Sequence, residues 1–217
     1  MKIISVNHIR THQKAFLNRT KARKRKLFCK IRGVNIVVNP GVFPPATDSK
    51  LLAANIKTSP KEKVLDVTSG AGTFGVIAGL QGAKGLAIDI NPEAVKNSRQ
   101  NFKRHGVNIK AARSNLFKNV PSVKFDQIFA NGPFFEGKII DDLDYAAYGF
   151  KKFINTLFAE VKNYLKPKGK LLLAVSAWSD LDFLKQQAKI NKLSCKLIKK
   201  KASNDKERLY YLYEIKT

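Results

Sequence analysis

The stretch VLDVTSGAGTFG, residues 64–75, joins an apolar run to a cluster of small residues and then to a second apolar run. Its first part is typical of a buried strand with Asp66 near its end, and a helix is predicted from Thr73 to Gln81. Between them, Gly70 and Gly72 allow the backbone to approach a ligand closely, because a Cβ there would collide with it. Free N–H groups at the start of the helix would face the same ligand. This stretch therefore predicts a strand, a ligand-binding loop and a helix in succession.

The alternation of strand and helix continues along the rest of the chain. Strands are predicted at 63–67, 85–90, 108–113, 125–130 and 170–176, and helices at 73–81, 92–105, 145–165 and 179–191. Two final strands, near 194–200 and 208–216, have no helix between them. Apolar strands that alternate with such helices favour a parallel sheet covered on both faces. The expected fold is α/β, with a seven-stranded, mostly parallel sheet, helices on both faces and an antiparallel C-terminal edge hairpin.

The N-terminal part of the chain is strongly basic. The chain has 41 Lys and Arg against 16 Asp and Glu, a formal net charge of +25, and its first acidic residue is Asp48. Such a surplus favours polyanionic partners such as nucleic acid, although a lysine-rich solvated face is the alternative. The densest block, KARKRK at Lys21–Lys26, either lies in solvent at a helix end or contacts phosphates. The basic C-terminal third, residues 150–217, is a second candidate for nucleic-acid contact.

Other features of the composition narrow the class of protein. We divide the chain into a short basic N-terminal extension, residues 1–40, with a predicted hairpin at 27–39, and a main domain, residues 41–217. Cys29 and Cys195 show no metal-ligand spacing, so we expect no metal site and a reduced, cytoplasmic location. No stretch has the length and apolarity of a membrane span, and the first ten residues lack a secretory apolar region.

Two further segments place polar side chains at the carboxyl ends of predicted strands, where ligands bind in such sheets. Asp89 lies near the end of strand 85–90, and its spacing from the glycine loop suits a carboxylate that accepts hydrogen bonds from both hydroxyls of a ribose. Ser114-Asn115-Leu116-Phe117 follows strand 108–113 and offers an amide for an adenine edge and a ring to pack against it. Dinucleotide binding is the main alternative, but its third glycine is absent from the usual place.

Together these three segments resemble the cofactor motifs of class I S-adenosylmethionine methyltransferases, across roughly residues 60–176. The resemblance implies a Rossmann-like fold and S-adenosyl-L-methionine as cofactor. It implies that the methionine end meets Asp66 and Gly70–Gly72, the ribose meets Asp89, and the adenine meets Asn115 with Leu116 or Phe117. Thr68 and Asn115 stand where the family more often has Gly and Asp. The implied cofactor-binding set is Thr47, Asp48, Asp66, Thr68, Ser69, Gly70, Gly72, Phe74, Asp89, Ile90, Asn115, Leu116, Phe117 and Asn131.

The segment Asn131-Gly132-Pro133-Phe134-Phe135 resembles the Asn-Pro-Pro-aromatic motif of methyltransferases that modify planar amino groups. The resemblance implies that Asn131 orients the amine, that Phe134 stacks on it, and that the catalytic set is Asn131, Pro133 and Phe134. Catalysis of this kind is mostly the positioning of a nucleophile in line with a reactive sulfonium. Gly132 replaces the first proline and removes a rigid φ. The alternative is a tight turn capped by buried aromatic residues.

The two ends of the main domain narrow the family. GVFPPATDSKLLA, residues 41–53, and RLYYLYEIK, residues 208–216, resemble parts of small HemK-like glutamine methyltransferases. This resemblance implies N-methylation of a glutamine in a protein of the translation apparatus, with Thr47 and Asp48 over the cofactor. Alternatively, Asp48 only caps its helix. The stretch SGAGTFGVIAGLQGAKG, residues 69–85, also resembles rRNA guanine N2-methyltransferases, so RNA base methylation is the alternative function. A small-molecule acceptor or a non-catalytic RNA-binding module are further alternatives.

Overall fold

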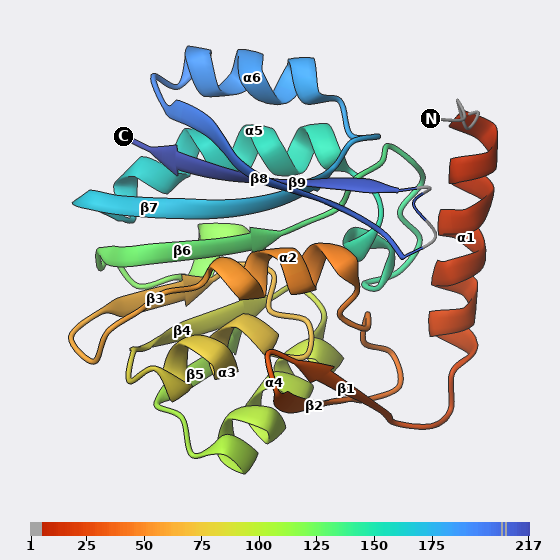
Figure 1. Ribbon diagram of the computed structural model, residues 1–217, viewed down its shortest axis with the longest axis horizontal. Helices are drawn as coiled ribbons and strands as arrows, with labels where there is room; N and C mark the ends of the chain where they lie inside the picture. The colour runs from red at the N-terminus through yellow and green to blue at the C-terminus, as the bar shows by residue number, and fades with distance from the viewer. Residues whose placement is uncertain (1–5, 205, 207) are drawn as a thin grey trace.

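A seven-stranded sheet forms the centre of the molecule, with strand order β5-β4-β3-β6-β7-β9-β8 (Figure 1). The computed structural model describes residues 6–204, 206 and 208–217, so positions 1–5 of the predicted extension lie outside the described residues. β3 to β7 run parallel, and β9 pairs antiparallel with both β7 and β8. The predicted sheet and its C-terminal hairpin are confirmed. The strands are β3 Lys63–Asp66, β4 Lys84–Asp89, β5 Ile109–Arg113, β6 Phe125–Asn131, β7 Leu165–Ser176, β8 Ser194–Ala202 and β9 Leu209–Lys216.

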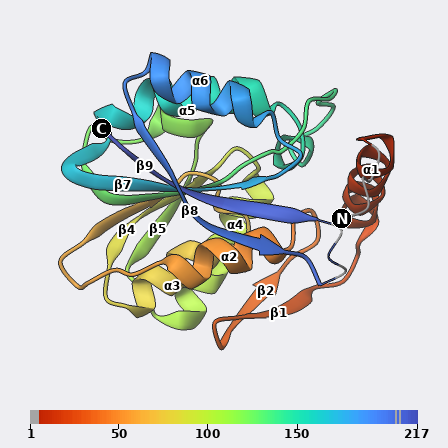
Figure 2. The same ribbon diagram turned by 45° about the horizontal axis from the view of Figure 1, so that its top comes forward.

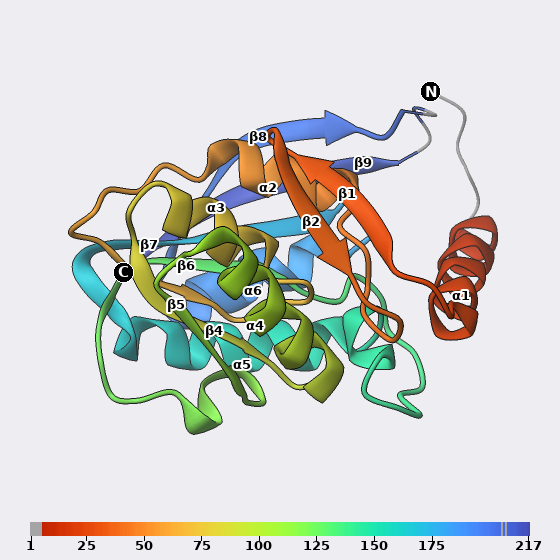
Figure 3. The same ribbon diagram turned by 90° about the horizontal axis from the view of Figure 1, so that it is seen from below.

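Helices cover both faces of this sheet. α2 Thr47–Asn55, α3 Thr73–Leu80 and α4 Pro92–His105 lie on one face, and α5 Phe150–Glu160 and α6 Leu181–Ile190 lie on the other (Figures 2 and 3). Two hydrophobic cores result because successive strand residues point to opposite faces. Val64 belongs to the core beneath α3, whereas its neighbour Leu65 belongs to the core beneath α5.

The helix boundaries differ from the expected ones where the backbone requires it. The helix predicted over residues 145–165 is broken, because Gly149 has a φ of +93° that a helix interior does not allow. A short 3-10 helix, Asp144–Ala146, precedes this break, and β7 begins at Leu165 directly after the shortened helix region. Asp180 caps α6 by accepting a hydrogen bond from the backbone N–H of Phe183, so this helix begins after the expected residue 179.

The N-terminal extension holds a helix as well as the predicted hairpin. α1 spans Val6–Ala22, and the hairpin consists of β1 Leu27–Ile31 and β2 Val34–Val38. Positive φ values at Arg32 and Gly33 form its two-residue turn. The hairpin packs on the core beneath α3, and the side chains of Asn97 and Asn101 on α4 hydrogen-bond to the backbone of β2. α1 stands apart from this hairpin, beside the carboxyl ends of the parallel strands (Figure 1).

Candidate active site

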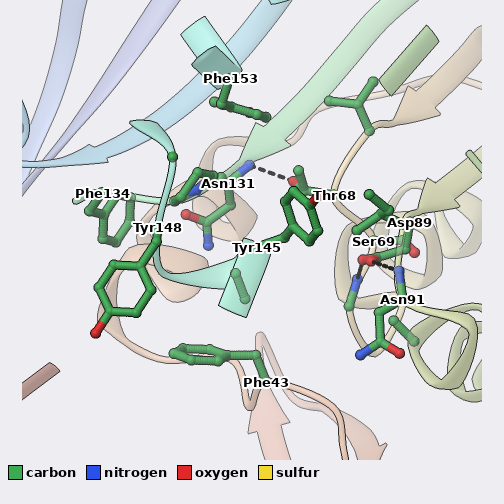
Figure 4. A pocket seen from close by; sticks show the side chains of 18 of the residues that line it. Phe43, Thr68, Ser69, Asp89, Asn91, Asn131, Phe134, Tyr145, Tyr148 and Phe153 are labelled. Atoms are coloured by element: carbon green, nitrogen blue, oxygen red, sulfur yellow. Dashed lines mark hydrogen bonds between the residues drawn. The ribbon is translucent and has the colours of Figure 1, made fainter. Parts of the chain in front are cut away.

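A cavity of about 620 Å³ lies at the carboxyl ends of the parallel strands. Its volume is in the range of small-molecule and cofactor pockets. The loop after β3, the ends of β4, β5 and β6, and residues 133–149 contribute to its wall. Parallel strands all end at the same edge of a sheet, so the polar residues that follow separate strands meet here. Figure 4 shows Asp89 and Ser69 at one end of the cavity and Asn131 with several aromatic rings at the other.

Most of the predicted site residues line this cavity. They are Asp48, Thr68, Ser69, Gly70, Phe74, Asp89, Ile90, Asn115, Leu116, Asn131, Pro133 and Phe134. Thr47, Asp66, Gly72 and Phe117 are not among the residues that line it, and their predicted contacts with a cofactor stay predictions. Thr47 begins α2 one residue before Asp48, and each helical residue turns the side-chain direction by about 100°.

The two loop glycines have different roles. Gly70 has a φ of +50°, and a Cβ built there would lie 3.9 Å from the nearest heavy atom, the carbonyl oxygen of Phe43. This glycine therefore leaves the cavity open to a ligand. Gly72 has a φ of +79°, and its Cβ would lie 2.9 Å from the ring of Phe102 on α4. Gly72 is thus needed for its backbone conformation and for the packing of α3 on α4, rather than for contact with a ligand.

Asp66 lies beneath the glycine loop instead of inside the cavity. The residue is fully buried, and its Oδ1 accepts a hydrogen bond of 3.4 Å from the backbone N–H of Thr68. Its Oδ2 has no hydrogen-bond partner among the described residues. Burial, with a smaller contribution from the charge of Asp89, raises the pKa of Asp66 to about 8 against the opposing effect of backbone N–H groups of the loop. Asp66 therefore lies beneath the loop, and its direct contact with the methionine end of a cofactor stays a prediction.

Asp89 and Asn115 line the end of the cavity that was predicted to hold the nucleoside. Asp89 Oδ2 accepts a hydrogen bond of 2.8 Å from the backbone N–H of Gly70, and Oδ1 accepts one of 3.0 Å from that of Asn91. Burial raises the pKa of Asp89, and these backbone hydrogen bonds oppose the rise. Each carboxylate oxygen has a second lone-pair site, so both remain able to accept from ribose hydroxyls. The carboxylate, the open glycine and the side chain of Asn115 fit a nucleoside cofactor.

Leu116 supplies the apolar contact at this end, and Phe117 does not. Leu116 lines the cavity and has a φ of +47°, which directs the following residue into the protein. Phe117 is 2% exposed and its ring stacks on Tyr164 with centroids 4.5 Å apart. The local sequence predicted that this segment borders the site, but it did not distinguish which of two adjacent apolar side chains would point into the cavity.

The side-chain amide of Asn131 has a fixed orientation at the other end of the cavity. Its Nδ2 donates to Asp48 Oδ2 at 2.6 Å and to Ser49 Oγ at 3.1 Å. A carboxylate accepts hydrogen bonds, so the NH₂ group must face Asp48 and the oxygen must face away from it. Asn131 Oδ1 is buried and has no partner among the described residues. A buried acceptor without a donor is costly, and a bound amino group would satisfy it.

Asp48 and Thr68 hold this asparagine in place. The N-cap of α2 is Ala46, so Asp48 does more than cap its helix: its side chain lines the cavity and contacts Asn131. Burial raises the pKa of Asp48, and the hydrogen bond from Asn131 opposes that rise. Thr68 Oγ1 accepts a hydrogen bond of 2.8 Å from the backbone N–H of Asn131. Thr68 thus links the loop after β3 to the end of β6 through its hydroxyl group, which a glycine at this position would lack.

Aromatic side chains that the sequence did not predict complete the wall around Asn131. They are Phe16, Phe43, Tyr145, Tyr148, Phe153, Trp178 and Tyr210. Figure 4 shows Phe43, Tyr145, Tyr148 and Phe153 grouped around Asn131 and Phe134. The connection between β6 and α5, residues 132–149, supplies two of the tyrosines. Its length was an available signal, because ordered loops longer than about 12–15 residues are usually functional.

Phe153 explains why residue 132 is glycine. A Cβ on Gly132 would overlap the ring of Phe153, which lies on the first turn of α5. Gly132 is absent from the residues with positive φ, so its backbone conformation by itself would accept a side chain. The ring therefore decides the residue type, and it occupies space next to the turn that carries Asn131 and Pro133.

Helix α1 is attached to the loop that carries these aromatic residues. Lys21 Nζ lies 2.8 Å from Asp141 Oδ2 and 2.6 Å from Asp144 Oδ1. Burial by itself lowers the pKa of Lys21, but the hydrogen bonds and charges of both carboxylates outweigh it and raise the pKa. Leu17 packs against Leu143 and Ala147 on the same loop. The helix is thus part of the cavity wall, to which it contributes Phe16.

Two kinds of site are not found in the described part of the chain. No group of His, Cys, Asp or Glu there has an arrangement that could hold a metal ion. None of the described helices is both long and apolar enough to cross a membrane.

Comparisons with known proteins agree with this geometry. Residues 33–193 match the family model described as "Methyltransferase small domain". The chain is 34% identical, over 159 residues, to a protein of Methanocaldococcus jannaschii named "Putative protein N5-glutamine methyltransferase", covering 70% of this chain and 80% of that protein. It is also 34% identical, over 117 residues, to ribosomal RNA small subunit methyltransferase C of Chromohalobacter salexigens, covering 54% of this chain and 32% of that protein. The chain thus spans only about a third of the rRNA enzyme.

Solved structures show the same fold. A methyltransferase from Pyrococcus furiosus superposes with a TM-score of 0.66 at 21% identity, covering 95% of this chain and 98% of that chain. The 16S rRNA N2 G1207 methyltransferase of T. thermophilus, in complex with AdoMet and guanosine, gives a TM-score of 0.63 at 20% identity, covering 89% of this chain and 50% of that chain. The chain therefore belongs to the methyltransferase small domain family, and the activity and cofactor that its motifs implied, methyl transfer from S-adenosylmethionine, are confirmed.

Proposed function

We propose that this protein transfers a methyl group to a planar amino nitrogen, and that its acceptor is the side-chain amide of a glutamine in a protein of the translation apparatus. The observation that carries this proposal is the side chain of Asn131, a residue that lines the cavity and whose buried Oδ1 has no partner among the described residues. A planar NH₂ group is a donor of matching geometry, and a hydroxyl or thiol acceptor would not need so fixed an amide.

Each residue at this end has a defined role in the proposed reaction. Asn131 Oδ1 and the carbonyl oxygen of Gly132 accept the two N–H bonds of the acceptor, which aims its nitrogen lone pair along one line. Phe134 packs on one face of the planar group. Bound S-adenosylmethionine supplies an electrophilic methyl group on its sulfonium. No side chain needs to act as a strong base if the acceptor's proton leaves after transfer.

The cofactor-binding roles are part of the same proposal. Asp89 accepts from the ribose hydroxyls, Asn115 and Leu116 contact the adenine, and the loop from Thr68 to Gly70 faces the methionine end. Phe74 and Ile90 line the same cavity. The support is that each of these residues borders one continuous cavity, with Asp89 and Ser69 at one end and Asn131 at the other (Figure 4).

Two observations bear on the acceptor. The M. jannaschii relative, whose printed name gives glutamine N5, has 80% of its length matched, and this favours a protein acceptor. The aromatic rings around Asn131 favour a second candidate, the exocyclic amine of an RNA base, because a splayed base stacks on such rings. Nucleic-acid contact through Lys21–Lys26 and the basic residues of 150–217, and a cytoplasmic location, belong to the proposal as well.

Transfer of labelled methyl groups to a cell extract tests the proposal. We expect labelling that survives ribonuclease and is lost on protease treatment, with N5-methylglutamine recovered after enzymatic digestion. Labelling that is lost on ribonuclease treatment would instead assign the RNA base as acceptor. N131A should bind S-adenosylmethionine but transfer no methyl group. N108A, at an exposed asparagine before β5, is the matched control and should remain active. Full activity of N131A would refute the proposed role.

A further inference from the structure

The run Lys21–Lys26 divides into residues with internal partners and residues that face solvent. Lys21 pairs with Asp141 and Asp144, and the guanidinium of Arg23 donates to the carbonyl oxygens of Arg25, Val38, Asn39 and Val42. These contacts fix the linker between α1 and β1 against the end of β2. Lys24, Arg25 and Lys26 are exposed, and no carboxylate of the described chain forms an ion pair with them.

Strand β1 continues this basic segment with an exposed aromatic ring. Successive strand residues point to opposite faces, so Phe28 and Lys30 share one side of the strand, while Cys29 and Ile31 point to the other. Lys26 directly precedes the strand. Phe28 is 77% exposed, whereas Ile31 is 2% exposed within the core. β1 pairs only with β2 in its two-stranded sheet, so its other edge is unpaired there. The fold does not need a ring at position 28, because the ring buries little surface there.

We propose that Lys24, Arg25, Lys26, Phe28 and Lys30, hereafter the N-terminal platform, bind a single-stranded RNA segment. The four cations would contact phosphates, and an exposed ring between them would stack on an unpaired base. An acidic protein segment would also pair with the four cations, but it has no flat base to stack on Phe28. The bases of a duplex are stacked on each other, so its ends alone offer a face to Phe28.

The position of the platform relates it to the cavity. Arg23 holds the linker, and α1 runs from the linker to the cavity, where Phe16 lines the wall. The platform therefore directly follows the helix that borders the cavity. The platform precedes residue 33, where the family match begins. This inference rests on the nucleic-acid contact in the proposed function and deepens it: it names the residues that bind and the single-stranded form of the RNA. It holds for a protein acceptor in an RNA-containing particle as well as for an RNA acceptor.

Fluorescence anisotropy with a labelled 12-nucleotide single-stranded RNA tests the platform in the full chain, without cofactor or acceptor. The variants are F28A, F28L, F28Y and the triple variant K24Q/R25Q/K26Q, titrated between 50 and 200 mM salt. The charge-matched control is K61Q/K63Q/K84Q, whose three exposed lysines lie at the opposite, amino-terminal edge of the parallel strands. An RNA duplex of the same sequence and polyglutamate serve as competitors.

We expect F28A and F28L to bind the RNA about tenfold more weakly and F28Y to bind like the wild type, since base stacking needs a flat ring. Each phosphate contact on a single strand contributes roughly 0.7 to the slope of log affinity against log salt, so the triple variant should lower this slope by about 2. The control variant should change the slope much less. Duplex and polyglutamate should compete poorly. Undiminished binding by F28A, an equal loss of slope in the control, or competition by polyglutamate as strong as by RNA would each overturn the platform. Failure of methyl transfer would leave these binding results unaffected.

Discussion

The contact between Gly132 and Phe153 makes a prediction that can be tested without knowledge of the acceptor. G132A introduces a Cβ where the ring of Phe153 lies, although the backbone conformation of residue 132 permits a side chain. We therefore expect G132A to destabilise the protein and F153A to relieve this effect. G132A should be almost neutral in the F153A background, where the ring is absent, so the two changes should be strongly non-additive.

The expected magnitudes follow from the packing. Overpacking by one methyl group costs about 2 kcal/mol of the free energy of unfolding where a ring must move. Phe153 is only half-buried, so F153A should cost about 2 kcal/mol, below the 3–5 kcal/mol typical of fully buried phenylalanines. Without coupling the double variant would lose about 4 kcal/mol; with the expected coupling it should lose about 2 kcal/mol. In a chain of this size the difference corresponds to roughly 4–8 °C in Tm.

Urea denaturation of the wild type, both single variants and the double variant measures the coupling. G79A is the matched control, because its Cβ would meet Val107 instead of Phe153. The losses from G79A and F153A should add within about 0.5 kcal/mol. Additive losses from G132A and F153A would refute the reasoning, since the ring would then not be what requires glycine at position 132.

Three further predictions concern single carboxylates and their partners. D89A should weaken S-adenosylmethionine binding by about 1.5–3 kcal/mol, because it removes hydrogen bonds to a charged group. Wild-type affinity in calorimetry would mean that the ribose binds elsewhere. Burial raises the pKa of Asp66 to about 8, so the protonated carboxyl contributes stability that is complete below the unfolded pKa of 3.8 and is lost as the pH rises through 8. D66N should flatten this decline of the free energy of unfolding with pH, measured by urea titration at pH 5, 7 and 9. An unchanged decline would contradict the prediction. K21Q should lower the free energy of unfolding by about 1–3 kcal/mol, because Asp144, whose side chain is 3% exposed, loses its cation. K24Q, on the exposed linker, is the control and should change the free energy of unfolding by less than about 0.5 kcal/mol. Equal effects of the two lysine variants would show that the ion pair contributes nothing.

Local sequence patterns were sufficient for most of the fold. The apolar run, glycine loop and apolar run at residues 64–75 predicted β3, the loop and α3, and Pro92 predicted the start of α4. These signals depend on neighbours within a few residues, so periodicity and capping residues reveal them. The break at Gly149 and the helix α1 were missed, because both depend on how loop 132–149 packs against the N-terminal segment.

The site was predictable in its composition but not in its geometry. Asp89, Asn115 and Asn131 each follow a strand, so parallel topology was enough to bring them to one cavity. Sequence did not reveal that Phe117 and Asp66 point into the protein, because burial patterns do not distinguish a core from a cavity wall.

Sequence by itself therefore determined the order of elements, the methyltransferase cofactor motifs and the edge of the sheet where they meet. Only the tertiary structure decided that Lys21 pairs with Asp144, 123 residues away, and that the Asn131 amide is oriented by Asp48. It also decided that the ring of Phe153 lies where a Cβ at position 132 would be. The physical reason is the range of the interactions: backbone conformation responds to adjacent residues, whereas these contacts join segments that meet only after the sheet has formed.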